Sequence, residues 1–192
     1  DYEAMEKMTA DLKIAIIFAK NTNSVAGASV TNPVVTDFVV NGTFDKAGVI
    51  DPWKTTGGFQ NQTTATNQNG AFTVPFFENW NPSAKVNKMY QTIENIPNGA
   101  YKLNIAAFVN TIAEPNESQY VFANEDKVYL TSADPTAYEV YTIVNNNTVE
   151  IGLEQTTATA GWMGIDNVSL TYYGPDADIA DVKASSVLAA YE

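Results

Sequence analysis

The sequence predicts a mainly β protein, an antiparallel β-sandwich with a helix at each end of the chain. Apolar and polar residues alternate through the middle of the chain, as in Tyr101-Lys102-Leu103-Asn104-Ile105, and a period of two is that of a strand with one buried face. Turn-forming residues such as Pro97-Asn98-Gly99 separate these runs at short intervals. Near both ends of the 192-residue chain the apolar spacing changes to three and four residues, which is the helical period.

Residues 1–24 are expected to form the first helix. Its apolar residues recur at spacings of three and four: Ala4, Met5, Met8, Leu12, Ala15, Ile16 and Ala19. Residues 25–32, which are small and polar, are interpreted as a linker. Two alternatives stay open for the helix: it packs on the domain as local decoration, or it belongs to a helical element that joins the sandwich to neighbouring domains of a longer chain.

Residues 33–174 are assigned to the sandwich. Nine segments are predicted strands: Val34–Val40, Ala71–Phe77, Val86–Ile93, Tyr101–Val109, Gln119–Ala123, Lys127–Leu130, Tyr138–Val144, Thr148–Leu153 and Ile165–Tyr173. So many short strands leave no room for the helical crossovers of a parallel sheet. The irregular stretch 48–69 is long for a compact domain, and such loops are often functional. In the tail, residues 175–192, a weaker helical period follows Pro175.

Composition excludes several classes of chemistry. The chain has 22 acidic residues against 10 cationic ones, all of them Lys, so its net charge is −12. It contains no Cys and no His, which excludes disulfides, thiolate metal sites and Ser-His-Asp catalysis. An acidic chain without Arg lacks the groups that neutralise phosphates, so nucleic acid is not an expected partner. No apolar run is long enough for a membrane span. The composition still allows three kinds of functional site: a pair of catalytic carboxylates, a cation site with oxygen ligands, and a site where carbohydrate stacks on aromatic rings.

Three motifs, in order, resemble those of a known family. Asn41-Gly42-Thr43-Phe44-Asp45 is followed by Trp53, Met89-Tyr90-Gln91-Thr92-Ile93 precedes a Pro97-Asn98-Gly99 turn, and Gly161-Trp162 precedes Ile165-Asp166-Asn167-Val168-Ser169-Leu170. This combination resembles the galactose-binding-like jelly rolls, the carbohydrate-binding-module-like β-sandwiches of secreted or surface polysaccharide-utilisation proteins of Bacteroidetes. The resemblance covers residues 33–174 and implies a jelly-roll sandwich. Function does not follow from fold alone.

The same resemblance implies a structural Ca²⁺ site. In the family, the acid of the opening motif and the acid of the last strand converge on one ion, and the matching residues here are Asp45 and Asp166. Oxygen ligands of this kind suit Ca²⁺. Asp45 stands where Glu is common in the family, which shortens its reach. The alternative is that both acids accept hydrogen bonds from nearby backbone N–H groups.

Aromatic residues beside amides and carboxylates suggest a glycan site, because sugar rings stack on indoles while polar side chains bond their hydroxyls. Trp80 fits this pattern best, since polar residues bracket it; the alternative is a buried strand end. Trp53 is a second candidate, although the family's tryptophan at this place folds the first loop onto the sandwich. The candidate glycan-binding residues are Trp80, Trp53, Glu78, Asn79, Asn81 and Gln60.

The leading hypothesis is therefore a non-catalytic carbohydrate-binding module within a larger secreted, periplasmic or surface protein. A net charge of −12 repels anionic glycans and favours neutral ones. One alternative is a structural or protein-interaction sandwich without a glycan site, which the flanking helices favour. A glycosidase is less favoured, because no recognisable pair of catalytic carboxylates emerges among Asp51, Glu78, Glu139 and Glu154.

Overall fold

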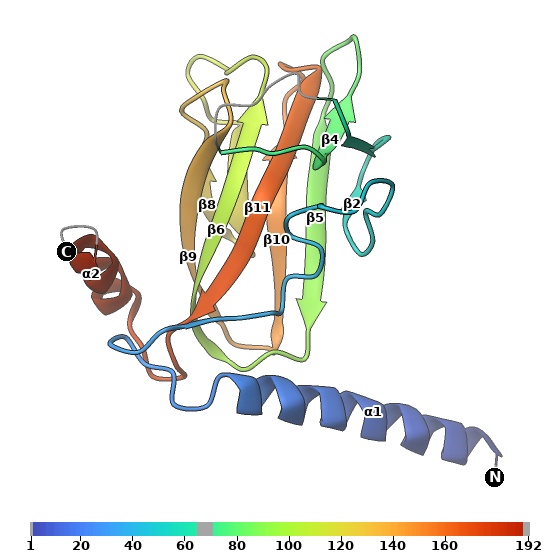
Figure 1. Ribbon diagram of the computed structural model, residues 1–192, viewed down its shortest axis with the longest axis vertical. Coiled ribbons are helices and arrows are strands. Elements are labelled where there is room, and N and C mark those ends of the chain that lie inside the picture. Colours follow the sequence, from blue (N-terminus) through green and yellow to red (C-terminus); the bar gives the residue numbers. More distant parts are fainter. Residues whose placement is uncertain (1, 65–70, 190–192) are drawn as a thin grey trace.

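Two antiparallel sheets pack face to face in a computed structural model, which describes residues 2–64 and 71–189 (Figure 1). One sheet has the order β3 (Gln60–Gln62), β4 (Phe76–Trp80), β11 (Trp162–Tyr172), β6 (Gly99–Val109), β9 (Thr136–Val144), with β1 (Val34–Val35) paired to β11. The other has the order β2 (Lys54–Thr55), β5 (Asn87–Glu94), β10 (Thr148–Gln155), β7 (Gln119–Ala123), β8 (Asp126–Tyr129). The predicted fold class, a β-sandwich flanked by helices, is confirmed.

The core lies between the two sheets and is built by strand alternation. Side chains such as Leu103 of β6, Leu153 of β10 and Ile165 of β11 are fully buried there. A second, smaller cluster lies on the outer face of the six-stranded sheet, where Phe72 packs edge-on against Phe76 and Phe108. This face therefore carries side chains that are buried by a covering loop, beside side chains that are open to solvent.

Each of the nine predicted strands overlaps a strand of the structure, with two boundary errors. The prediction Val34–Val40 is too long, because the chain leaves β11 after Thr36 and then turns through positive φ angles of 54° at Asn41 and 50° at Phe44. The prediction Ala71–Phe77 is displaced, because Pro75 has no N–H for a ladder and β4 begins only at Phe76. Both β2 and β3 were missed inside 48–69, since these short polar strands show no alternation.

The opening and closing motifs meet beside β11. The N–H of Val168 donates to the carbonyl of Gly42 at 2.9 Å, where a β-bulge interrupts β11 between Asp166 and Ser169. Asn167 within the bulge has a φ of 51°. A side chain at position 42 would place its Cβ 2.2 Å from the Val168 oxygen, so only glycine permits this approach.

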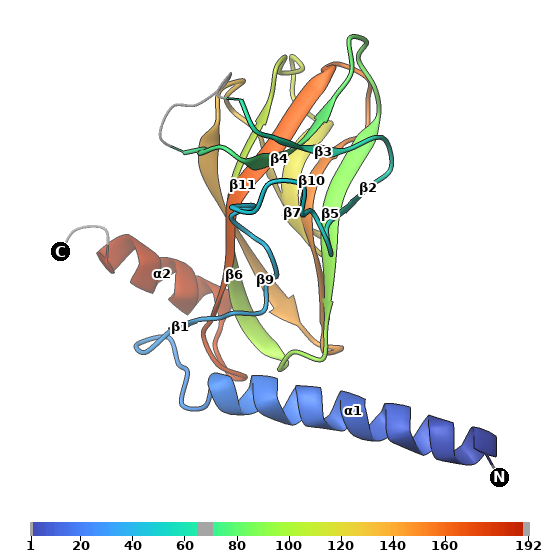
Figure 2. The same cartoon turned by 45° about the vertical axis from the view of Figure 1, so that its right-hand side comes forward.

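The two helices differ in how they attach to the sandwich. Helix α1 (Tyr2–Ser24) lies below the sheets and has no buried residue (Figure 2). Helix α2 (Ile179–Ala189) buries Val182 against Ala100 and Tyr173. Helix α1 therefore contributes no side chain to the core, and the two alternatives for its role stay open. Within residues 2–64 and 71–189, no helix is sufficiently long and apolar to cross a membrane.

Candidate functional site

Trp80 ends strand β4 on the outer face of the six-stranded sheet, and its side chain is 59% exposed. Alternation along β4 places Glu78 on the same face, and pairing with β3 sets Gln60 opposite Glu78. Pairing with β11 sets Trp162 opposite Trp80. The structure thus brings three of the predicted glycan-binding residues, Trp80, Glu78 and Gln60, to one corner of the sheet.

Glu78 is the polar centre of this corner. Its side chain is 1% exposed and its carboxylate accepts hydrogen bonds from Trp162 Nε1 at 2.6 Å, Gln60 Nε2 at 2.5 Å and Gln62 Nε2 at 3.3 Å. The Trp162 ring also packs edge-on against Phe108, with 4.8 Å between ring centroids. Buried polar groups fixed by several partners are rigid, so Glu78 positions the neighbours of Trp80 rather than facing solvent itself.

Asn79 and Asn81 differ in exposure because Asn79 lies within β4 on its inner face, whereas Asn81 follows the end of the strand at Trp80. Asn81 is exposed, and its Oδ1 accepts a hydrogen bond from the N–H of Ser83 at 3.0 Å. Asn79 is fully buried; it donates to Thr55 Oγ1 at 3.2 Å and accepts from Lys85 Nζ. The prediction of Asn79 as a sugar-contacting residue is corrected, since alternation turns its side chain away from the face that carries Trp80.

Trp53 is also removed from the glycan-binding set. Its side chain is 1% exposed, and its Nε1 donates to the carbonyls of Val40 at 3.0 Å and Asn41 at 3.1 Å. The indole packs against Phe44 and Phe77, with ring centroids 5.5 and 6.2 Å away. Trp53 therefore folds the first loop onto the sandwich, which was the family's implied role for it, and presents no ring to a ligand.

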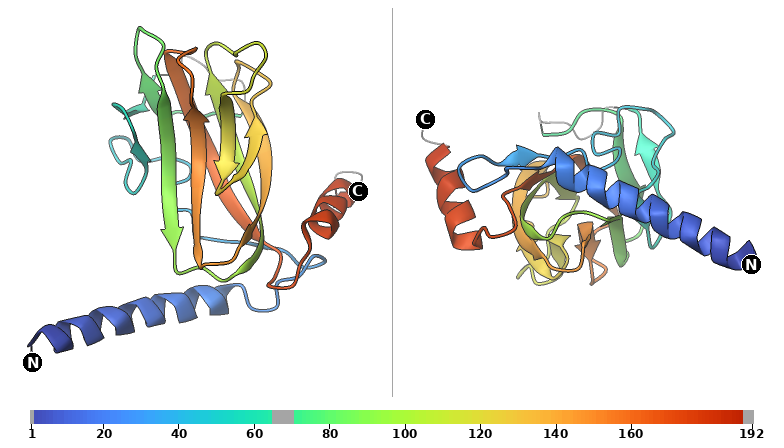
Figure 3. Two further views of the ribbon diagram at one scale, coloured as in Figure 1. Left: turned by 180° about the vertical axis from the view of Figure 1, so that it is seen from behind. Right: turned by 90° about the horizontal axis from the view of Figure 1, so that it is seen from below.

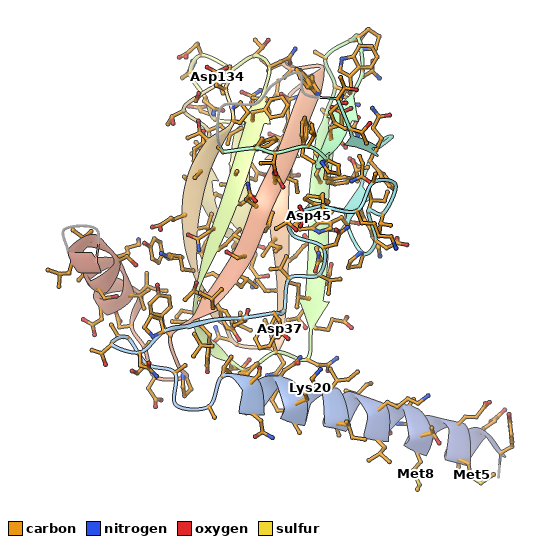
Figure 4. The ribbon with its side chains drawn as sticks, viewed as in Figure 1. Met5, Met8, Lys20, Asp37, Asp45 and Asp134 are labelled. Atoms are coloured by element: carbon orange, nitrogen blue, oxygen red, sulfur yellow. The ribbon has the colours of Figure 1, made fainter. Side chains whose placement is uncertain are left out.

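Asp45 and Asp166 are brought together where the two motifs meet. Asp166 is buried; its carboxylate accepts hydrogen bonds from the N–H groups of Thr73 at 2.9 Å and Asn167 at 2.8 Å. Burial raises the pKa of Asp166 to about 6, and the nearby charge of Asp45 contributes in the same direction. Asp45 is exposed and accepts a hydrogen bond from Thr43 (Figure 4). Within the described residues, no cluster of three or more acidic side chains surrounds this pair.

A hollow of about 540 Å³, which sequence reasoning missed, is lined by residues of the five-stranded sheet and its turns. Figure 3, left, shows the strands of this sheet in front. The wall of the hollow includes Lys88 of β5, Tyr120 and Phe122 of β7, and Glu150 and Glu154 of β10. The turn residues Asn124, Asn145 and Asn146 close one end. The only sequence signal was the alternation of these residues along their strands, which also describes an ordinary solvated sheet face.

Charged side chains cover the aromatic rings of this hollow. Lys127 Nζ lies 4.0 Å from the centroid of Tyr120, and Lys88 Nζ lies 4.9 Å from that of Phe122 and pairs with Glu150. The Tyr120 hydroxyl donates to Glu154 at 2.7 Å. Tyr120 and Phe122 are only 4% and 3% exposed. The hollow therefore offers charged and amide groups for hydrogen bonding, but it has no open ring for stacking.

Known proteins resemble this chain in structure rather than in sequence. No family model and no curated protein matches the sequence. Among solved structures, the chain is similar to a family 16 carbohydrate-binding module, with 19% identity and a TM-score of 0.50 over 70% of this chain and 99% of that one. It is also similar to a cyclase from Fischerella sp. TAU, with 13% identity and a TM-score of 0.51 over 76% of this chain and 100% of that one.

A third likeness is a family 61 carbohydrate-binding module solved with β-1,4-galactotriose, with 13% identity and a TM-score of 0.46 over 70% of this chain and 97% of that one. Several structural neighbours are thus carbohydrate-binding modules, while others are enzymes. At these identities the likeness establishes the β-sandwich fold alone. Because the same fold serves both binding and catalysis, function is argued from the site.

Proposed function

We propose that this chain is a non-catalytic carbohydrate-binding domain whose main contact is the exposed ring of Trp80. The observation that carries the proposal is a large indole, 59% exposed, held on a strand rather than on a mobile loop. Trp162 lies opposite Trp80 in the pairing of β4 with β11, and its Nε1 donates to Glu78 on the same face. A rigid exposed ring next to amide donors, here Gln60 and Asn81, has the groups that a sugar needs for stacking and for hydroxyl bonding.

Trp80 is preferred to the hollow on the other sheet because only Trp80 offers an uncovered ring. The rings of the hollow lie under Lys88 and Lys127, so stacking there would first require two cation–π contacts to break. A net charge of −12 favours neutral glycans over uronic or sulfated polymers. We place the domain in a larger secreted, periplasmic or cell-surface protein, where it would concentrate a partner domain on a polysaccharide.

Calorimetric titration with soluble neutral polysaccharides (galactan, xylan and a mixed β-glucan) and with an acidic one, polygalacturonate, tests the proposal. One neutral class is expected to bind, and Trp80→Ala is expected to weaken that binding by roughly 30-fold or more, since loss of a central tryptophan costs about 2 kcal/mol or more. Tyr129→Ala is the matched control, because Tyr129 is an exposed aromatic (45%) on the other sheet. It is expected to leave the affinity unchanged.

The hollow is tested in the same titration with Glu150→Gln, which removes the ion pair to Lys88. Unchanged affinity is expected. Loss of binding in Glu150→Gln with normal binding in Trp80→Ala would move the site to the five-stranded sheet. No binding by a folded protein to any of the four polysaccharides would contradict glycan binding and favour a structural or protein-interaction module, which the exposed face of α1 makes the second candidate.

We further propose that Asp45 and Asp166 hold a structural Ca²⁺. Two neighbouring carboxylates fit a hard cation that takes oxygen ligands, and the pKa of Asp166 is raised mainly by burial and further by the negative charge of Asp45. At 10 mM Ca²⁺ and a Kd of about 0.1–1 mM, the expected stabilisation is roughly 1.4–2.7 kcal/mol, or about 3–10 °C in Tm. Asp45→Asn should abolish this shift in a thermal melt. An equal shift in the variant would place the cation elsewhere.

A further inference from the structure

Helix α1 presents an apolar stripe that no residue within 2–64 and 71–189 buries. We define the α1 stripe as Met5, Met8, Leu12, Ile16 and Ala19. All five residues are exposed, and the exposed fractions of the four larger side chains are 59–73%. In Figure 4 the side chains of Met5 and Met8 point away from the sandwich. Contiguous exposed apolar surface of this kind marks an interaction site.

The side of α1 that approaches the sandwich is a different one. Asn21 Nδ2 donates to the carbonyl of Asn95 at 2.9 Å, and Ile14 and Phe18 line a gap of about 380 Å³ between the helix and the turns at Asn95 and Asn147. Seen from below, the C-terminal part of α1 lies in front of the sandwich and its N-terminal part extends beyond it (Figure 3, right). The α1 stripe is therefore open to a partner that approaches from below.

The spacing of the stripe is symmetric about Leu12. When a second α1 helix runs in the opposite direction with Leu12 against Leu12, Met5 faces Ala19 of the second copy and Met8 faces Ile16. Each member of the stripe then meets another member, and the long Met5 side chain meets the small Ala19. Spacings of three and four residues are those of paired helices that interdigitate.

The distribution of charge along α1 favours antiparallel pairing with a second copy of the same helix. The helix holds three acidic residues and three lysines, so it is neutral, and the entire −12 resides in the rest of the chain. Its first half (residues 2–12) has a net charge of −2 and its second half (13–24) a net charge of +2. Antiparallel pairing sets the acidic half of each helix against the basic half of the other, with Glu6 close to Lys20 of the second copy, and it also opposes the helix dipoles.

We propose that two copies of this chain dimerise through antiparallel pairing of their α1 stripes about a two-fold axis at Leu12. The two sandwiches then lie on opposite sides of the helix pair, because each stripe faces away from its own sandwich. This isologous arrangement doubles the number of Trp80 sites, but it stands independently of glycan binding.

Sedimentation equilibrium of the full chain from 1 to 200 μM tests the dimer. The wild type is expected to dimerise and Leu12→Glu to stay monomeric, with the Tm of the sandwich unchanged because Leu12 is not buried in the protomer. Val187→Glu is the matched control, an exposed apolar residue (58%) on α2, and is expected to dimerise like the wild type. A wild-type monomer at 200 μM, or a monomer that instead binds neutral phosphatidylcholine vesicles, would overturn the proposal.

Direction and pairing are tested by charge exchange and by cross-linking. Glu6→Lys and Lys20→Glu are each expected to weaken the dimer by ~10-fold, whereas the double variant restores it. Because the chain has no cysteine, Leu12→Cys is expected to form a disulfide-linked dimer on oxidation. Met5→Cys is not, since the two copies of residue 5 would lie about 21 Å apart along the axis. Efficient cross-linking of Met5→Cys would show a parallel pair and overturn the proposed arrangement.

Discussion

At the scale of single residues, the site depends on which face of a strand each side chain takes. Glu78 and Trp80 are two residues apart and share the outer face, whereas Asn79 between them is buried on the inner side. The two tryptophans differ because of where they lie: Trp80 ends β4 and is open, while Trp53 lies in the loop before β2 and donates its N–H to two backbone carbonyls in the core. Position on the pleat, more than residue type, decides the function of each group.

The first prediction concerns the contact between the opening and closing motifs. Gly42→Ala is expected to lower stability by about 1–3 kcal/mol, because the added Cβ would lie 2.2 Å from the Val168 oxygen. Thermal melts should show a Tm lower by about 3–10 °C. Gly58→Ala is the control, since no atom lies within 4 Å of its Cβ position. Equal melting of Gly42→Ala and the wild type would contradict the close packing described here.

The second prediction concerns pH. Burial raises the pKa of Asp166 to about 6, above the unfolded value of about 3.9, so the folded state holds a proton that the unfolded state releases. The stability contributed by this group is fully present below pH 4 and is lost as the pH rises through 6. In EDTA, the Tm of the wild type should therefore fall between pH 4 and 7.5 more steeply than the Tm of Asp166→Asn. Parallel pH profiles would contradict the raised pKa.

Much of the site could be predicted from neighbouring residues, and the failures have physical causes. Polar residues around Trp80 indicated an exposed ring, and the ring is exposed. The sequence could not tell that Asn79 points inward, because a strand boundary wrong by a few residues reassigns faces. For Trp53 the resemblance already implied the inward role that the structure shows. The hollow on the other sheet escaped notice because Lys88, Tyr120 and Glu150 come from three strands that only the sheet order brings together.

At the scale of elements, the two helices show how far local periodicity can be trusted. The spacing of Met5, Met8 and Leu12 predicted a helix, and the helix is present. Periodicity alone does not identify the partner of the apolar face, which here is not the sandwich. Conversely, α2 has the weaker pattern, yet Val182 is fully buried. The short strands β2 and β3 were not predictable, because neither has an apolar period and both depend on pairing with a longer neighbour.

The third prediction follows from this difference between the helices. Deletion of residues 1–20 is expected to change the Tm of a dilute sample by no more than about 2 °C, because no residue of α1 is buried. In contrast, Val182→Ala in α2 is expected to lower it, since the side chain fills space against Ala100 and Tyr173. Differential scanning calorimetry compares the two, with Val187→Ala as the exposed control for the substitution. A large loss of stability on deletion would show that α1 supports the sandwich.

At the scale of the whole molecule, the sandwich separates its possible functions in space. Trp80 ends β4 of the six-stranded sheet, and the hollow is lined by strands of the other sheet. Helix α1 lies across one end of the sandwich (Figures 1 and 3). A ligand on Trp80 and a second copy on α1 would therefore not compete for the same surface. The net negative charge lies outside α1, which agrees with the proposed preference of the sandwich for neutral glycans.

The most direct test of the central claim is acrylamide quenching of tryptophan emission with and without a saturating neutral polysaccharide. The chain has three tryptophans; Trp53 is 1% exposed, Trp162 is half-buried and Trp80 is 59% exposed, so Trp80 dominates quenching. The glycan is expected to lower the quenching constant of the wild type to that of Trp80→Phe, and to leave the variant unchanged. A glycan that binds by calorimetry and leaves wild-type quenching unchanged would contradict the assignment of Trp80 as the binding ring.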